Sequence, residues 1–298
     1  MTIRARNEDG GEGGARVVTQ TSIAAAFAAG DGGAADLDRE RWLFLTPHDD
    51  DVVLGAGMLL EEATRTGIRT TVCVVTDGRM GYCRPEQRDD IIAIRRAETE
   101  RAMELLGGPA IRRLDYPDCD LPNHAGRRRI AGGAEGISDG ASTGAAVDYP
   151  DPRGGHTGLQ NSFTALLRDL RPTRVFVPTG ADYHPDHQIV HRELLISLFH
   201  ATGAIWPELG APLPAPPQLY ETAIYCDFPA PPTLQIQGSP EAFERKLGAV
   251  IAFASQEQIA AIVDGVRSAG PFEYVRAVPF SLYDSRRYAK LFGGDGAT

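Results

Sequence analysis

Apolar runs and stretches with helical spacing alternate along the middle of the chain. Residues 42–45 form a continuous apolar run that stops at Pro47, which is typical of a strand covered on both faces. The apolar positions after Asp51 have helical spacing and predict a buried helix that ends at Gly67. The next elements predicted are a strand at 71–75, a helix at 88–106 and a strand at 111–114.

Strand, helix, strand, helix, strand with short connections is the pattern of an α/β protein with parallel strands. We expect a Rossmann-like three-layer fold in which helices flank a mostly parallel sheet and the active site lies at the C-terminal ends of the strands. A Gly-, Asp- and Arg-rich stretch at 117–158 interrupts the pattern, and we expect it to form the rim of that site. The later elements predicted are a helix at 159–170, strands at 174–178 and 219–225, and helices at 240–253 and 256–269.

The first 38 residues differ in composition from the rest of the chain. They combine Gly, Asp and Glu with few large apolar side chains, so we expect a flexible N-terminal extension at 1–38 and a single domain at 39–298. The short apolar stretch at 23–29 has neither the length nor the basic leader of a signal peptide. We therefore expect neither export nor a membrane span.

Charge and cysteine content narrow the classes of partner. Forty acidic against thirty basic residues give a formal net charge of -10, which opposes binding to nucleic acid and to anionic lipid. The four cysteines are widely spaced and form no C-x-x-C pair, so they indicate neither a disulfide framework nor a cysteine zinc site. We expect a cytoplasmic protein with no nucleic-acid partner and no stable membrane insertion, and a homo-oligomer is compatible with these features.

Two clusters of metal-binding residue types lie where strands are predicted to end. His48 and Asp51 are three residues apart where a strand becomes a helix, and His187 follows the end of another strand at the same edge of the sheet. A catalytic zinc site commonly has three protein ligands of these types and one position open to water. The sequence therefore predicts a Zn²⁺ site with His48, Asp51 and His187 as ligands.

The neighbours of these ligands are suited to proton transfer. A zinc ion lowers the pKa of its water from 15.7 toward roughly 7 and polarises an amide carbonyl. Asp50, next to the ligand Asp51, is the best-placed base for that water. His184 faces the same site, and if Asp186 holds it protonated it can stabilise an oxyanion and donate a proton to the leaving amine.

At these residues the chain resembles the LmbE/PIG-L family of N-acetylglucosaminyl de-N-acetylases. The family's His-Pro-Asp-Asp-Glu type motif appears as residues 48–52, and its His-x-Asp-His motif appears as residues 184–187. The resemblance implies metal ligation by His48, Asp51 and His187, catalysis by Asp50, His184 and Asp186, and substrate binding by Arg95 and Asp118.

Two departures from the family pattern stand out. Asp49 and Val52 replace the usual proline and glutamate, which leaves the ligand positions intact and alters their surroundings. Phe253 stands where many members have a histidine before a Ser-Gln pair, so any substrate role of that histidine is lost.

The same residues also have structural interpretations. Residues 49–51 could form a polar turn that caps a helix, Arg95 could pair with another helix charge, and Asp118 could be a turn residue. His187 and His191 have the spacing of an H-E-x-x-H metalloprotease, but Gln188 occupies the place of the required glutamate. A protease assignment is weakened accordingly.

We expect a zinc-dependent hydrolase that removes an N-acetyl group from an N-acetylglucosamine-type amino sugar or its conjugate. Its partner would be a small N-acetylated sugar or glycoconjugate. The alternatives are a Mg-dependent phosphoesterase that uses the cluster at 49–51 and a non-catalytic carbohydrate-binding relative of the same fold. The presence of Asp50 argues against a pure binder, because binding alone needs no base beside a metal.

Overall fold

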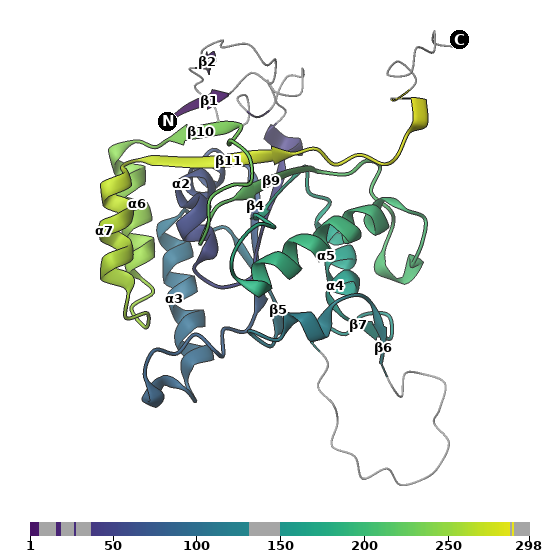
Figure 1. The fold of residues 1–298 in the computed structure, drawn as a ribbon, viewed down its shortest axis with the longest axis horizontal. Helices are drawn as coiled ribbons and strands as arrows, with labels where there is room; N and C mark the ends of the chain where they lie inside the picture. Colours follow the sequence, from purple (N-terminus) through teal and green to yellow (C-terminus); the bar gives the residue numbers. More distant parts are fainter. Residues whose placement is uncertain (6–15, 19–26, 28–36, 131–149, 287, 289–298) are drawn as a thin grey trace.

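The structure of the protein is a computed structural model, which describes residues 1–5, 16–18, 27, 37–130, 150–286 and 288. Among these residues, six α-helices lie around a nine-stranded sheet (Figure 1). The strands of that sheet are β1 (Thr2–Ala5), β2 (Arg16–Val18), β3 (Arg41–Thr46), β4 (Arg69–Thr76), β5 (Ala110–Tyr116), β8 (Arg174–Pro178), β9 (Gln218–Thr222), β10 (Leu234–Gln237) and β11 (Phe272–Val278). The helices are α2 (Asp51–Arg65), α3 (Ile91–Leu105), α4 (Leu159–Leu170), α5 (Pro185–Thr202), α6 (Pro240–Ile251) and α7 (Ile259–Ala269).

The sheet has a parallel part and an antiparallel part. Its strand order is β2-β1-β10-β11-β9-β8-β3-β4-β5, in which β9, β8, β3, β4 and β5 are parallel neighbours. These are the strands that the apolar runs predict. The remaining strands extend the sheet beyond β9 in antiparallel pairings, which the sequence did not indicate. The predicted α/β class is confirmed, and the parallel part carries the elements next to the site.

Alternate side chains of β3 show why the sheet is covered on both faces. Trp42 and Phe44 pack in one core with residues of α2, α3, α6 and α7, whereas Leu43 and Leu45 pack in a second core with residues of α4 and α5. Successive residues of a strand point to opposite faces, so an uninterrupted apolar run places both sets in a core. The three predicted layers are visible in Figure 1, with α3, α6 and α7 on one side and α4 and α5 on the other.

The N-terminal segment contributes to the fold, contrary to the prediction that the fold begins after residue 38. Strand β1 pairs with β10 and with β2, and Phe27 is buried against Trp42, Phe176 and Tyr220 with ring centroids 4.9 to 5.9 Å apart. Isolated short strands carry little sequence signal, since their pairing partners lie far away in the chain. These residues are part of the sheet and of the core where a flexible extension was expected, and residues 6–15, 19–26 and 28–36 lie outside the described residues.

The loops after the parallel strands meet at one edge of the sheet. The chain leaves β3 and enters α2 at residues 47–50, leaves β8 and enters α5 at 179–184, and leaves β5 at Pro117. Of the stretch at 117–158 that was predicted to form a rim, residues 131–149 lie outside the described residues. In the part of the chain that the structure describes, no helix has the length and apolar character needed to cross a membrane.

Candidate active site

The first cluster is held by hydrogen bonds between the end of β3 and the start of α2. The Asp51 carboxylate accepts from the His48 amide at 2.8 Å and from the Thr46 hydroxyl at 3.1 Å, both through Oδ2. Asp51 is also the first residue of α2, where a negative charge interacts favourably with the helix dipole. Its second oxygen, Oδ1, is buried, and the nitrogen it faces is Nε2 of His187 at 3.2 Å.

The second cluster begins α5. Pro185 occupies the first turn of this helix, and His184 caps it by accepting a hydrogen bond through Nδ1 from the Asp186 amide at 3.2 Å. His187 follows one turn in and is completely buried. The cap fixes the His184 ring beside the helix and leaves Nε2 as the nitrogen that is free to act elsewhere.

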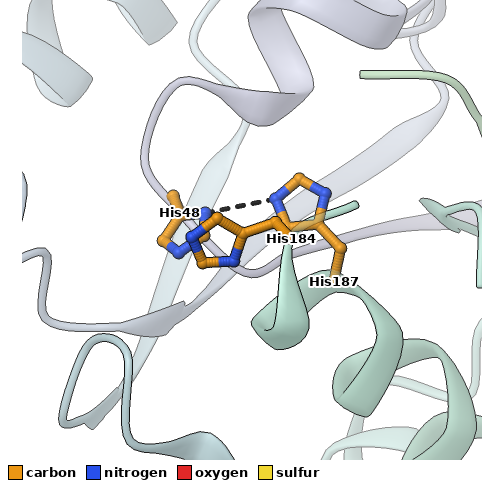
Figure 2. A group of neighbouring side chains, drawn as sticks. All are labelled: His48, His184 and His187. Carbon is orange, nitrogen blue, oxygen red and sulfur yellow. Dashed lines mark hydrogen bonds between the residues drawn. The ribbon is translucent and has the colours of Figure 1, made fainter. Parts of the chain in front are cut away.

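The two clusters meet, as their predicted positions at one sheet edge require. His48 Nδ1 lies 3.2 Å from His187 Nε2 (Figure 2) and 3.4 Å from Asp51 Oδ2, while Asp51 Oδ1 lies 3.2 Å from His187 Nε2. Ligand atoms about 2.1 Å from a tetrahedral ion lie about 3.4 Å from one another. The separations of these donor atoms therefore fit a single zinc-sized ion held by His48, Asp51 and His187.

The outer nitrogens of both imidazoles face carboxylates. His48 Nε2 lies 3.1 Å from Asp118 Oδ1 and 3.5 Å from Asp186 Oδ2, and His187 Nδ1 lies 3.2 Å from Asp182 Oδ2. A carboxylate favours a proton on the nitrogen that it faces, so the inner nitrogens each present a lone pair toward Asp51. Three lone pairs directed at one buried point are stabilised by a cation, and the donor set therefore fits a metal.

Charges around the donors also favour a cation. Burial alone would lower the pKa of His48, but Asp51 and the two carboxylates beside Nε2 raise this pKa well above its ordinary value. Burial alone would raise the pKa of Asp51, and His187 and His48 instead hold it well below its ordinary value. The cluster thus stabilises positive charge at this point, and metal binding would supply that charge by displacing protons.

Asp118 and Asp186 both contact His48, a contact that was not among their predicted roles. Asp118 was expected to bind substrate, and its side chain is 6% exposed. Asp186 was expected to support His184, yet its carboxylate accepts from the Cys119 amide at 2.9 Å and faces His48. Because Pro185 starts the helix, the group of Asp186 that contacts the His184 ring is its backbone amide.

His184 lies beside the donor set with a ring centroid 4.6 Å from that of His48 and 5.3 Å from that of His187 (Figure 2). Burial, together with those two histidines, lowers the pKa of His184. Asp186 acts in the opposite direction, but its charge does not offset burial and the two histidines. A neutral ring whose Nδ1 accepts from an amide carries its proton on Nε2, which makes it a hydrogen-bond donor to a ligand.

Asp50 and Arg95 are joined by an ion pair. Arg95 Nη2 donates to Asp50 Oδ1 at 3.0 Å, and the two side chains are 4% and 16% exposed, respectively. The Arg95 side chain offers little exposed surface for the predicted substrate contact, and Asp50 is the more exposed of the two. The structure thus places the predicted base next to the predicted ligand set and gives it a buried cationic neighbour.

Two residues near the site were not predicted. Asp182 is completely buried and accepts from the amides of His184 at 2.9 Å and Tyr225 at 3.2 Å, besides facing His187. The Tyr225 ring lies 5.1 Å from that of His187. Burial, with Asp51 and Asp50 nearby, raises the pKa of Tyr225, so the phenol stays protonated. The position of Tyr225 after β9, at the same sheet edge as both histidine clusters, was the available signal.

Comparisons of sequence place this site in a known context. A family profile described as GlcNAc-PI de-N-acetylase, PIG-L, matches residues 43–197, which include both histidine clusters. The chain is 37% identical over 86 residues to a diacetylchitobiose deacetylase of Thermococcus kodakarensis, a match that covers 28% of this chain and 32% of that protein. It is 29% identical over 160 residues to a 1D-myo-inositol 2-acetamido-2-deoxy-alpha-D-glucopyranoside deacetylase of Corynebacterium urealyticum, covering 51% and 46% of the two chains. The matches thus span less than half the length of these relatives.

Solved structures share the fold at low sequence identity. The N,N'-diacetylchitobiose deacetylase of Pyrococcus horikoshii superposes with a TM-score of 0.62 at 21% identity, over 86% of this chain and 92% of that one. The 4-carboxy-2-hydroxymuconate hydratase of Pseudomonas putida superposes with a TM-score of 0.58 at 16% identity, over 82% and 98% of the two chains. Because proteins of different activity share the architecture, the fold does not by itself select a reaction, and the residues of the site must carry that argument.

Proposed function

Because the chain belongs to the GlcNAc-PI de-N-acetylase (PIG-L) family, we propose that it is a zinc-dependent hydrolase that removes the N-acetyl group from an N-acetylglucosamine-type amino sugar or its conjugate. The observation that carries this proposal is the convergence of His48, Asp51 and His187 at separations of 3.2 to 3.4 Å, with Asp50 next in sequence to Asp51. A metal site with an adjacent carboxylate is one arrangement that can hydrolyse an amide, because it supplies both an activated water and a base.

The donor set supports zinc over magnesium. Two imidazole nitrogens and one carboxylate are donors that Zn²⁺ accepts readily, whereas Mg²⁺ prefers an octahedral shell of oxygen atoms. A magnesium phosphoesterase would use the carboxylates of residues 49–51 together. Asp49 instead points away from the donors, toward Arg95 and Arg113, so the three carboxylates do not form one oxygen cluster.

The roles of the protein groups follow from their positions. When bound, zinc would act as a Lewis acid that activates water and polarises the amide carbonyl. Asp50 would take the proton of the attacking water and return it to the amide nitrogen as the C–N bond breaks, releasing acetate and an amine. His184 would donate a hydrogen bond through Nε2 to the carbonyl oxygen as negative charge develops there.

The substrate class comes from the relatives together with the site. The relatives are named as deacetylases of diacetylchitobiose and of 1D-myo-inositol 2-acetamido-2-deoxy-alpha-D-glucopyranoside, both of which contain an N-acetylated amino sugar. Tyr225 and Tyr183, 50% and 79% exposed, belong to the strand end and the loop that border the donors. Exposed aromatic rings provide apolar surface for a sugar face, which agrees with a small N-acetylated sugar or glycoconjugate as partner.

Metal analysis and acetate release test the proposal together. Purified protein should contain about one Zn²⁺ per chain, and it should release acetate from at least one member of a panel of N-acetylated glucosamine conjugates. Removal of the metal by a chelator should abolish release, and added Zn²⁺ should restore it. A protein with full metal content that releases no acetate from the panel would contradict the deacetylase assignment.

A pair of histidine variants tests the ligand set. His187→Ala should lose the metal and the activity, because it removes one of three ligands. His200→Ala is the matched control, since His200 lies on the same helix but packs against Trp206 with a centroid distance of 4.3 Å. Equal metal retention in His187→Ala and wild type would rule out this ligand set.

A further inference from the structure

The guanidinium of Arg95 lies between two neighbouring carboxylates of the first cluster. Nη2 donates to Asp50 Oδ1 at 3.0 Å, and Nε lies 3.6 Å from Asp49 Oδ2. One oxygen of Asp50 is thereby engaged, so the other oxygen is the one available to a water molecule. A carboxylate that is held at one oxygen by a buried cation has a restricted orientation, which is what a base in a reaction of defined geometry needs.

Asp49, which stands where the family usually has proline, is built into the same network. It is completely buried, and its Oδ1 accepts from Thr99 Oγ1 at 2.6 Å and from Arg113 Nη1 at 2.8 Å. A Cβ atom on Gly78 would come within 3.0 Å of Asp49 Oδ2, and Gly78 has φ +72, so this position both makes room for the carboxylate and favours glycine. The buried Asp49 and the partly buried Asp50 therefore face two arginines, Arg95 and Arg113, which oppose their negative charges.

Phe253, the second departure from the family pattern, contacts the same arginine. Its ring lies 5.5 Å from Arg95 Cζ and is completely buried, which is the geometry of a cation–π contact. The segment that carries the ring is bonded to α3, because Ser255 donates to Glu98 through its amide at 2.7 Å and through its hydroxyl at 2.8 Å. The Phe253 ring contacts the guanidinium of Arg95 without accepting a conventional hydrogen bond, so it does not compete with Asp50 for the N–H groups of Arg95.

Both departures thus act on one residue. We propose that Arg95 is a positioning residue for Asp50, and that Asp49 and Phe253 hold its guanidinium in the required place, with Arg113 compensating the charge of Asp49. This role rests on the proposed function, in which Asp50 is the base. A positioning role differs from a substrate contact, because a positioning Arg95 affects the rate only through Asp50.

Kinetics of Arg95→Met separate the two roles. Loss of positioning should lower kcat on the order of 10-fold to 100-fold, with KM changed less than about twofold and the zinc content unchanged. The matched control is Arg96→Met, the next residue on the same helix, whose 42% exposed side chain pairs with Asp115 at the surface. This control should match wild type in kcat and KM.

A double variant makes the test sharper. In an Asp50→Asn background Arg95 has no base to position, so Arg95→Met should change the residual kcat by less than about twofold. A substrate contact would raise KM in both backgrounds. Phe253→Leu, which keeps an apolar side chain and removes the π face, should lower kcat a few-fold with wild-type KM, and it serves also if Arg95→Met does not fold.

Acetate release by the wild-type protein tests the proposed function. The role of Arg95 is tested separately, by the ratios of kcat and of KM between the variants and their parent proteins. A second readout needs no activity: crystal structures of wild type, Arg95→Met and Phe253→Leu should show the Asp50 carboxylate displaced by about 1 Å or more in the variants. An Asp50 carboxylate that keeps its place in both variants, or an Arg95→Met effect that appears in KM and persists without Asp50, would overturn the proposal.

Discussion

Asp182 is predicted to control metal affinity although it does not touch the metal position. Its carboxylate is completely buried and lies between three partners, the ring of His187 and the amides of His184 and Tyr225. A carboxylate behind a ligating histidine fixes the ring and increases its basicity. The perturbation of choice is Asp182→Asn, which keeps the shape of the side chain and removes its charge.

The magnitude follows from the acceptors that Asp182 provides. Asp182 accepts from His184 through Oδ1 and from Tyr225 through Oδ2, and Oδ2 also faces His187 Nδ1. An asparagine amide places its NH₂ group against at least one N–H donor whichever way it is oriented, and an unsatisfied buried group costs about 1–3 kcal/mol. Loss of such a partner typically weakens metal binding 10-fold to 100-fold, which corresponds to about 1.4–2.7 kcal/mol.

The assay is competition for Zn²⁺ with a chromophoric chelator, accompanied by thermal unfolding of the zinc-loaded proteins. Asp264→Asn is the matched control, because the Asp264 side chain is 81% exposed and its removal should leave the Kd unchanged. An Asp182→Asn protein that is folded and binds Zn²⁺ within about twofold of wild type would refute the reasoning that Asp182 acts through His187.

Three further predictions concern catalysis and stability. Asp50→Ala should retain its metal and lose on the order of 10²-fold or more in turnover; loss of zinc, with full turnover regained on metal addition, would exchange the roles of Asp50 and the next residue. His184→Ala should likewise keep zinc and lower kcat on the order of 10²-fold, measured by acetate release, and an unchanged kcat would exclude it from the reaction. Burial alone would raise the pKa of Glu40, but hydrogen bonds from Arg174 and Thr173 lower it below the ordinary 4.5. A carboxyl whose pKa is lower in the folded than in the unfolded protein adds stability that is fully present above the unfolded pKa and is lost as the pH falls through the folded pKa. Glu40→Gln should therefore lower the free energy of unfolding by on the order of 1–2 kcal/mol at pH 7, and the Tm of the variant should approach that of wild type in acid.

Local sequence patterns determined the parallel part of the fold. The apolar run at 42–45 forms β3, which is covered on both faces, and the predicted helix at 159–170 has the bounds of α4. The position of the histidine clusters also follows from order along the chain, since parallel strands end at one edge of a sheet. The convergence of His48, Asp51 and His187, the proposed metal donors, was predictable for that reason.

Tertiary structure decided what surrounds those donors. Strands β1, β10 and β11 pair over long sequence separations, and their short segments have no pattern that identifies a partner. The partners of buried charges are likewise set by packing: Arg113 reaches Asp49 from a position 64 residues away, and Asp118 and Asp186 both turn to His48. Residue types alone indicate that a carboxylate can bind substrate, a histidine or an arginine. Only the folded chain decides which of these lies within about 3 Å, because electrostatic and hydrogen-bond energies depend on that distance.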